Sequence, residues 1–121
     1  MDKPTLIIGA SLQPERYSNM AIVKLLKYNH TVYAIGSKQG VVQHIIIHTS
    51  TTIHITSVHT VSLYINATLQ EQYYKYILEL KPTRLIFNPG TENEVLYNKA
   101  TAIGIQCLNA CTLVMLQSQL Y

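Results

Sequence analysis

Residues 5–11 read TLIIGAS and residues 13–18 read QPERYS, and this opening decides the fold of the 121-residue chain. A short apolar run that breaks at a glycine, followed by an amphipathic segment from Ser18, predicts a buried strand, a tight loop and a helix. Gly9 allows a ligand to approach the backbone, Ser11 adds a hydroxyl, and the N-terminus of the helix presents unpaired N–H groups. The opening is therefore typical of the first unit of a nucleotide-binding α/β domain, and it suits a phosphate.

The length and composition of the chain limit what it can be. One domain with a substantial core fits this length, so we expect a single domain over residues 1–121. Apolar residues make up 48% of the chain and charged residues only 12%, which excludes a disordered chain. The net charge of +3 favours an anionic small molecule, but Lys and Arg form no clustered stripe of the kind that nucleic-acid binding requires.

Neither a membrane span nor a secretory signal is expected. No apolar run reaches the roughly 18 to 20 residues that cross a bilayer, and the first predicted strand begins too early to leave room for a signal peptide. We therefore expect a cytoplasmic protein that does not enter a membrane. Cys107 and Cys111 are the only cysteines and lack C-x-x-C spacing, so we expect buried small residues rather than a redox or zinc site.

Strands and helices alternate along the chain. A helix from Ser18, as its N-cap, to Tyr28 and a strand over residues 31–35 complete a βαβ unit, which is nearly always right-handed and parallel. The remaining main strands are expected over residues 61–65, 84–87 and 105–108. This alternation predicts an α/β fold with an open, mainly parallel five-stranded sheet and helices on both faces.

Two capping boxes of the S/T-x-x-E type mark the later helices. The first begins at Thr68 and predicts a helix that runs to Leu80, and the second begins at Thr91 and predicts a helix that ends at Gly104. The last apolar segment, residues 113–116, has no periodicity that settles its type.

Residues 41–60 are rich in β-branched side chains and poor in charge. They predict a short β-hairpin or edge ribbon, over about residues 41–59, inserted before the next main strand. Histidines in this segment raise the question of a metal site: His44, His48, His54 and His59. A zinc site needs converging ligands with ordered partners, and the ribbon contains no Cys, Asp or Glu. We therefore expect solvent-facing strand histidines and no metal site.

In an open parallel sheet the ligand crevice lies at the carboxyl ends of the strands, where the strand order reverses. The residues predicted at these ends are glycines, small hydroxyls and amides: Gly9, Ala10, Ser11, Gly36, Ser37, Lys38, Asn66, Ala67, Asn88, Pro89 and Gly90. Arg16 and Lys38 are the nearby cations, and Glu15 and Glu92 the nearby carboxylates. Backbone amides and hydroxyls suit phosphates, whereas acid–base or nucleophilic catalysis needs a positioned His, Cys or carboxylate pair. We expect ligand binding without catalytic residues.

The end of the second strand bears on the choice of ligand. Dinucleotide folds that bind a ribose with free hydroxyls usually place an Asp or Glu there, and this chain has Gly36, Ser37 and Lys38. A phosphate on the ribose is therefore favoured, although Lys38 taken alone fits an ordinary solvated loop lysine equally well.

Several of these segments together resemble the small stand-alone CoA-binding proteins. They are GAS at residues 9–11, Pro14, RYS at residues 16–18, Gly36, IFNPGTEN at residues 86–93 and ACTLVML at residues 110–116. That family shares its Rossmann-like domain with the N-terminal part of the succinyl-CoA synthetase α subunit. The resemblance covers nearly the whole chain, and the NPGTEN segment is its most specific part.

The resemblance implies a Rossmann-like domain that binds coenzyme A along the strand ends. Gly9, Ala10 and Ser11 would line the pyrophosphate, Arg16 and Lys38 would reach phosphates, and Asn88, Pro89 and Gly90 would face the pantetheine. The expected binding set is completed by Tyr17, Ser18, Gly36 and Ser37. The ligase domain and phosphohistidine region of the synthetase have no counterpart here, so the resemblance does not carry over the ligase activity.

Three hypotheses of function follow. The first is a small cytoplasmic domain that binds CoA or an acyl-CoA without catalysis, as a carrier, sensor or regulatory partner. The second is a minimal NAD(P)-dependent oxidoreductase, but the G-x-G-x-x-G motif is absent because Ser11 and Pro14 stand at its second and third glycines. The third is an interaction domain without ligand, in which the ribbon of one copy pairs with that of another as a homodimer.

Overall fold

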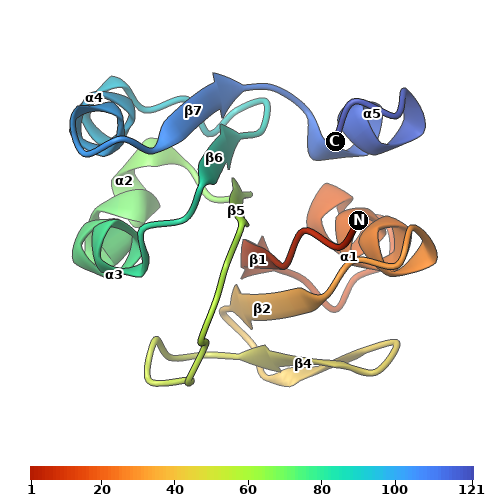
Figure 1. The fold of residues 1–121 in the computed structure, drawn as a ribbon. Coiled ribbons are helices and arrows are strands. Elements are labelled where there is room, and N and C mark those ends of the chain that lie inside the picture. The colour runs from red at the N-terminus through yellow and green to blue at the C-terminus, as the bar shows by residue number, and fades with distance from the viewer.

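The computed structural model describes residues 1–121 and contains one seven-stranded sheet in the order β3-β4-β2-β1-β5-β6-β7 (Figure 1). All neighbouring strands pair in parallel except β3, which lies at the edge and runs antiparallel to β4. The strands are β1 (Thr5–Ala10), β2 (Val32–Gly36), β3 (Gly40–Val42), β4 (Ile45–His48), β5 (Thr60–Leu63), β6 (Arg84–Phe87) and β7 (Gln106–Asn109).

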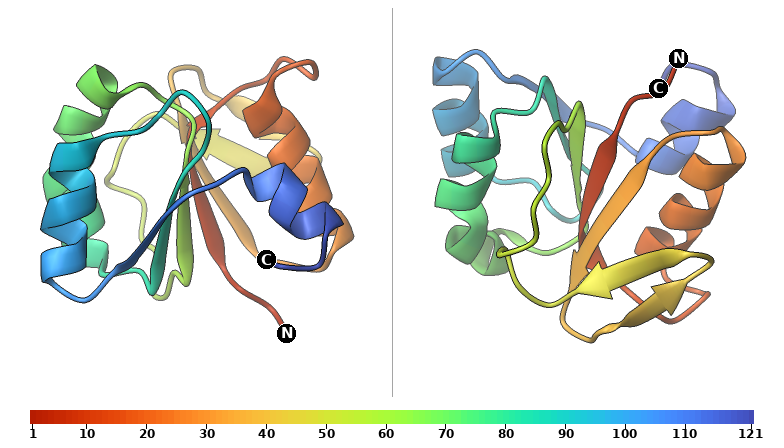
Figure 2. Two further views of the ribbon diagram at one scale, coloured as in Figure 1. Left: turned by 90° about the horizontal axis from the view of Figure 1, so that it is seen from above. Right: turned by 60° about the horizontal axis from the view of Figure 1, so that its bottom comes forward.

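Helices cover both faces of this sheet (Figures 1 and 2). They are α1 (Tyr17–Lys27), α2 (Ala67–Gln70), the 3₁₀ helix η1 (Glu71–Tyr73), α3 (Tyr74–Leu80), α4 (Glu94–Ala102) and α5 (Thr112–Gln117). One face carries α1 and α5, and the other carries α2, α3 and α4 (Figure 1). The unsettled segment near the end of the chain is thus a helix, α5. None of these helices has the length and apolar composition needed to span a membrane.

The apolar opening of the chain forms a strand that is buried on both faces. Leu6 and Ile8 belong to the core under α3 and α4, whereas Ile7 belongs to the core under α1 and α5. Alternate residues of a strand point to opposite faces, so covering both faces requires an uninterrupted apolar run. This is why β1 is uniformly apolar instead of alternating between apolar and polar residues.

The predicted α/β fold is confirmed, and the inserted ribbon is part of the sheet. The five predicted main strands are β2, β1, β5, β6 and β7, and the ribbon adds a hairpin in which β4 pairs with β2. The hairpin ends at His48, and residues 49–59 form an irregular connection to β5 instead of a strand. The segment TSTT at residues 49–52 explains the early end, because Ser and Thr side chains bond locally and favour turns.

All three predicted N-caps were wrong. Arg16, not Ser18, precedes α1 and makes no side-chain cap. Asn66 caps α2 and Asn93 caps α4, where Thr68 and Thr91 had been expected. Each Asn side chain accepts a hydrogen bond from the backbone N–H three residues later, and Asn is at least as good a cap as Thr. The predicted helix from Thr68 to Leu80 is also interrupted by η1.

The topology places a reversal of strand order between β1 and β5. From β1 the chain proceeds outward through β2 to the hairpin, returns to the other side of β1, and continues outward through β5, β6 and β7. In the left view of Figure 2, the red loop after β1 and the teal loop after β6 both arch over the upper edge of the sheet. This carboxyl edge is where an open parallel sheet binds its ligand.

Candidate functional site

Gly9 lies at the carboxyl end of β1, where the segment after β5 approaches most closely. Its φ of +97° is unfavourable for other residues, and a Cβ there would lie 2.8 Å from Cγ2 of Ile65 and 2.9 Å from the carbonyl carbon of Tyr64. The glycine is therefore required by the packing of the protein itself. The sequence interpretation had given it to ligand approach alone.

Gly36 brings the ends of β1 and β2 together in the same way. A Cβ on Gly36 would lie 2.3 Å from the carbonyl oxygen of Ala10, its partner in the register of the two strands. The register between β1 and β2 is irregular at this point, between Ile8 and Ala10. Both glycines thus shape the floor of the carboxyl edge.

A cleft of about 250 Å³ opens at these strand ends. It is lined by Gly9, Gly36, Ser37, Thr49, Ile65, Leu69, Gln72 and Tyr73. The residues at the ends of β1, β2 and β4 contribute glycine backbone and hydroxyl groups, and those from Ile65 to Tyr73 contribute apolar and aromatic side chains and the amide of Gln72. Such a lining accommodates both a polar group and a flat apolar ring.

The loop between β1 and α1 holds Ser11 by two contacts. The hydroxyl oxygen of Ser11 accepts a hydrogen bond from the backbone N–H of Gln13 at 3.1 Å, and Nδ2 of Asn19 donates to the Ser11 carbonyl at 2.9 Å. The hydroxyl proton of Ser11 remains available for donation to a ligand. Asn19, a buried residue of α1 that sequence reasoning missed, therefore fixes the position of the predicted phosphate contact.

The first backbone N–H groups of α1 have no side chain that caps them, and no acidic residue lies in the first turn of this helix. Arg16 is exposed and donates through Nε to the side-chain oxygen of Gln13, at 3.1 Å. Tyr17 is exposed as well, whereas Ser18 is buried within the first turn of the helix. Of the predicted RYS segment, only Arg16 and Tyr17 present side chains at the surface.

The second predicted loop, residues 88–93, is held from inside the protein. Asn88 is 2% exposed and its side chain is fully used: Nδ2 donates to Oγ of Ser62 and to the carbonyl of Leu63, and Oδ1 accepts from the N–H of Thr112, each at 2.8 Å. The side chain of Asn88 thus joins β5, β6 and α5. Pro89 and Gly90 are the predicted residues of this loop that reach the surface.

Gln70 and Asn93 provide the second support of this loop, and the sequence analysis did not identify either. Nε2 of Gln70 donates to the carbonyls of Ile65 and Thr91, at 2.9 and 2.7 Å. Nδ2 of Asn93 donates to Oε1 of Gln70 at 2.9 Å and to the hydroxyl of Tyr74 at 2.8 Å. The bonds of Gln70 to Thr91 and Asn93 join residues more than 20 positions apart, so no local pattern indicates them.

Cations predominate at one part of the carboxyl edge. Arg16 and Lys38 follow β1 and β2 together with a single carboxylate, Glu15, whereas Glu92 follows β6 without a cation. The ion pair of Lys75 with Glu79, and the contact between Asp2 and His30, involve none of these side chains. The end of the edge near β1 and β2 is therefore the one that attracts anions.

The histidines do not form a cluster. No group of three or more His, Cys, Asp or Glu side chains comes together anywhere in the structure. His44 and His54 are exposed, as expected, but His48 and His59 are half-buried. His48 also ends β4 beside Ile35, so it lies at the carboxyl edge and not away from it. It has no carboxylate within ion-pairing distance.

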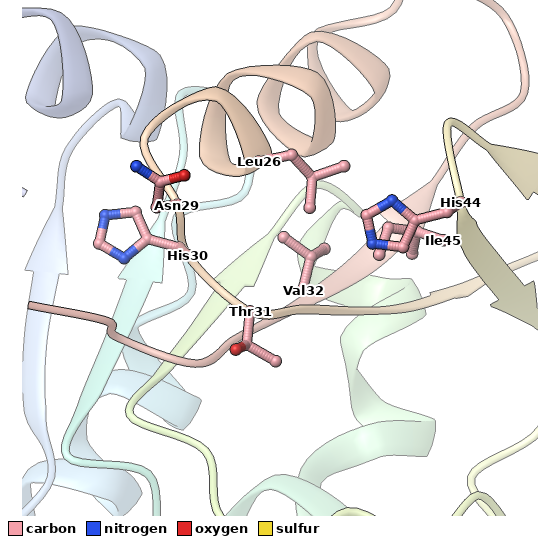
Figure 3. A pocket seen from close by; sticks show the side chains of 7 residues that line it. All are labelled: Leu26, Asn29, His30, Thr31, Val32, His44 and Ile45. Carbon is pink, nitrogen blue, oxygen red and sulfur yellow. The ribbon is translucent and has the colours of Figure 1, made fainter.

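A second, wider cavity of about 480 Å³ lies at the amino ends of the strands. It is lined by Leu26, Asn29, His30, Thr31, Val32, His44 and Ile45 (Figure 3). His30 and His44 lie on opposite sides of this cavity, with Leu26, Thr31 and Val32 between them (Figure 3). The arrangement offers no converging polar groups, and it is on the edge of the sheet opposite to the predicted loops.

Burial favours the protonated, neutral form of two side chains that could otherwise act as nucleophiles or acids. It raises the pKa of the Cys107 thiol, which therefore stays protonated, and it raises the pKa of the Tyr64 hydroxyl, which has no hydrogen-bond partner. Cys107 is buried as expected, but Cys111 is only half-buried, and both are free thiols.

Residues 3–117 match a protein-family model described as a CoA binding domain. The chain belongs to the CoA-binding domain family. The match covers most of the sequence and includes both loops of the carboxyl edge, so it confirms the resemblance drawn from the GAS and NPGTEN segments. A search of curated proteins found no match to this CoA-binding domain.

Several solved structures share the fold of this chain. An uncharacterized protein is 42% identical, with a TM-score of 0.96, and the match covers 100% of this chain and 99% of that chain. A hypothetical protein from Pyrococcus horikoshii OT3 is 24% identical, with a TM-score of 0.86, and covers 98% of this chain and 84% of its own. A conserved hypothetical protein from Pyrococcus furiosus is 22% identical, with a TM-score of 0.79, and the match covers 94% of this chain and 98% of that chain. The latter two show that the CoA-binding domain shares their fold.

Proposed function

We propose that this domain binds coenzyme A or an acyl-CoA at the carboxyl edge of its sheet and does not itself catalyse a reaction. The observation that carries the proposal is the cleft at the reversal of strand order, between the ends of β1 and β2 and residues 65–73. Glycine backbone and the hydroxyl residues Ser37 and Thr49 line this cleft. Ser11, Arg16 and Lys38 follow the same two strands, β1 and β2, and they add a fixed hydroxyl and two cations, which are groups that phosphates prefer.

The nucleotide end of CoA fits the part of the edge near β1 and β2. Gly9, Ala10 and the hydroxyl of Ser11 would face the pyrophosphate, and Arg16 and Lys38 would neutralise phosphate charge. Tyr73 offers the cleft an aromatic surface for the adenine. No acidic side chain ends β2, which favours a ribose that carries a phosphate, as in CoA.

The side chains at the edge support binding without chemistry. The hydroxyl of Ser11 has no adjacent general base, because its bonding partner is the N–H of Gln13. His48 has no carboxylate partner, and Glu92 is bonded to a backbone N–H. We therefore infer a carrier, sensor or regulatory role in the cytoplasm.

Titration calorimetry with CoA tests this proposal. The protein is expected to bind CoA, and Ser11→Glu to weaken binding by about tenfold or more, because a carboxylate beside the pyrophosphate repels it. Ser57→Glu makes the same change on an exposed residue of the connection before β5 and is expected to leave the affinity unchanged. Undetectable binding at millimolar CoA would overturn the proposal, and a response to NADPH but not to CoA would favour the oxidoreductase hypothesis.

The open edge of β3 favours a second property, the pairing of two copies. Val41 is 59% exposed and its cross-strand partner Ile46 is 51% exposed, so an apolar pair lies beside a strand with unpaired backbone groups. Sedimentation over a range of concentrations tests this pairing, and a monomer at every concentration would contradict it.

A further inference from the structure

Glu92 is the only charged residue that the loop after β6 exposes. Within residues 88–93, only Pro89, Gly90 and Glu92 are exposed, because the other three side chains are buried. The loop is held by Gln70, whose Nε2 bonds the carbonyl of Thr91 at 2.7 Å. Any molecule that crosses this loop therefore meets a fixed surface on which Glu92 is the carboxylate, and the next exposed one, Glu94, begins α4.

That carboxylate is held in place over the turn. Oε1 of Glu92 accepts a hydrogen bond from the backbone N–H of Gly90 at 2.9 Å. A Cβ on Gly90 would meet no atom within 4 Å, so the space above the turn is open. No Lys, Arg or His side chain lies within ion-pairing distance of Glu92, so its charge is balanced by no side-chain cation.

The direction in which CoA would lie follows from the excess of cations near β1 and β2, where Arg16 and Lys38 outnumber Glu15. The phosphates of the nucleotide end are attracted to Arg16 and Lys38, which follow β1 and β2. From β2 to β6 there are three strand spacings of about 4.8 Å, or about 14 Å in total. This distance is comparable with the length of an extended pantetheine arm, so the thiol or thioester would reach the loop that carries Glu92.

We propose that Glu92 makes the site select against acyl groups that carry a carboxylate, and that the acyl-CoAs of this domain have neutral or cationic acyl groups. The inference rests on the proposed function. Repulsion between two carboxylates disfavours a dicarboxylic acyl chain near Glu92, whereas an acyl chain without charge is unaffected. Because Glu92 is exposed, the selection is moderate and weakens as salt is added.

A comparison of butyryl-CoA with succinyl-CoA tests this inference, since both acyl groups have the same number of carbon atoms and only the second ends in a carboxylate. Calorimetry at low ionic strength is expected to show about threefold tighter binding of butyryl-CoA, and about equal binding at high salt. Glu92→Gln, which retains an oxygen for the N–H of Gly90, is expected to abolish the difference, and Glu92→Lys to reverse it.

Glu79→Gln provides the matched control, because it removes the same charge from an exposed residue near the end of α3, at the opposite edge of the sheet. It is expected to leave the preference intact. Equal binding of the two ligands to the unmodified protein at low salt, or an unchanged preference in Glu92→Gln, would overturn the inference. Binding of CoA itself reports separately on the proposed function, because free CoA has no acyl group to discriminate.

Discussion

The side-chain oxygen of Asn88 accepts a hydrogen bond from the backbone N–H of Thr112 at 2.8 Å. The same side chain donates to Ser62 and Leu63, so one amide connects the end of β6 to β5 and to the first residue of α5. Thr112 Oγ1 lies 2.8 Å from Oγ of Ser62, which closes the network. Every polar atom of the Asn88 side chain has a partner inside the protein, and the loop that begins at Asn88 is fixed in consequence.

Replacing Asn88 by Ala is expected to lower the free energy of unfolding by about 2 to 4 kcal/mol, because the substitution leaves buried donors and acceptors without partners. Urea denaturation measures the change. Asn98→Ala, at an exposed position of α4, is the control and should change the free energy by less than about 0.5 kcal/mol. A small effect at Asn88 would mean that water replaces the network.

Gly9→Ala and Gly104→Ala separate two costs of losing a glycine. The two residues have φ values of +97° and +92°, so both substitutions incur the left-handed penalty of about 1 to 2 kcal/mol. Only the Cβ at Gly9 meets neighbours, Ile65 and Tyr64, whereas that at Gly104 meets none within 4 Å. Thermal denaturation should therefore show a clearly larger loss for Gly9→Ala, and equal losses would contradict the assigned packing role.

The parallel strands were predictable because their sequence signal is local. A strand covered on both faces needs an apolar run. Such a run fills most of residues 5–8, and it makes up the last three residues of the strand over residues 84–87. Where two residues competed for one role, the local pattern failed: Thr68 and Thr91 have good capping-box spacing, but Asn66 and Asn93 are the caps. Both kinds of side chain can accept the bond, but the hydroxyl of Thr91 donates to the Asn88 carbonyl instead, which leaves the cap of α4 to Asn93.

Features that depend on distant parts of the chain were not predictable. His48 reaches the carboxyl edge because β4 pairs with β2, and no local pattern specifies the partner of a hairpin strand. Gly9 has the sequence context of a ligand contact, but its requirement comes from Ile65, across the reversal of strand order. Gln70 has the sequence context of a surface helix residue, yet it is fully buried and bonds to Thr91, in the loop after β6.

Tyr121 is expected to contribute to stability through Arg84. Arg84 is 5% exposed and has no carboxylate partner; its guanidinium carbon lies 4.2 Å from the centre of the Tyr121 ring, and Nη1 donates to the Tyr121 carbonyl at 3.0 Å. Tyr121→Ala would remove the ring that covers this buried cation and should cost about 3 kcal/mol in unfolding free energy. Tyr17→Ala, at a largely exposed tyrosine, is the control and should have little effect on the midpoint of thermal unfolding.

Mild acid is expected to destabilise the protein through His30 and His59. Burial lowers the pKa of both imidazoles below the ordinary value of 6.5, and the cations of Lys3 and Arg84 lower both further, while Asp2 raises that of His30. The unfolded chain therefore binds more protons than the folded chain between 6.5 and the lowered values. The contribution of these two side chains to the free energy of unfolding is therefore at its maximum above pH 6.5. It falls as the pH decreases from 6.5 to the lowered pKa values, and it stays constant below them.

Urea midpoints measured from pH 8 to pH 5 should record this fall, and His59→Gln should reduce it. The neutral glutamine has no proton to gain, so one of the two contributions disappears. His54→Gln changes an exposed histidine in the connection before β5 and should leave the pH dependence as it is. A midpoint that stays constant across this range would contradict the assignment of the acid sensitivity to these two side chains. So would a fall in the midpoint that neither His59→Gln nor His30→Gln reduces.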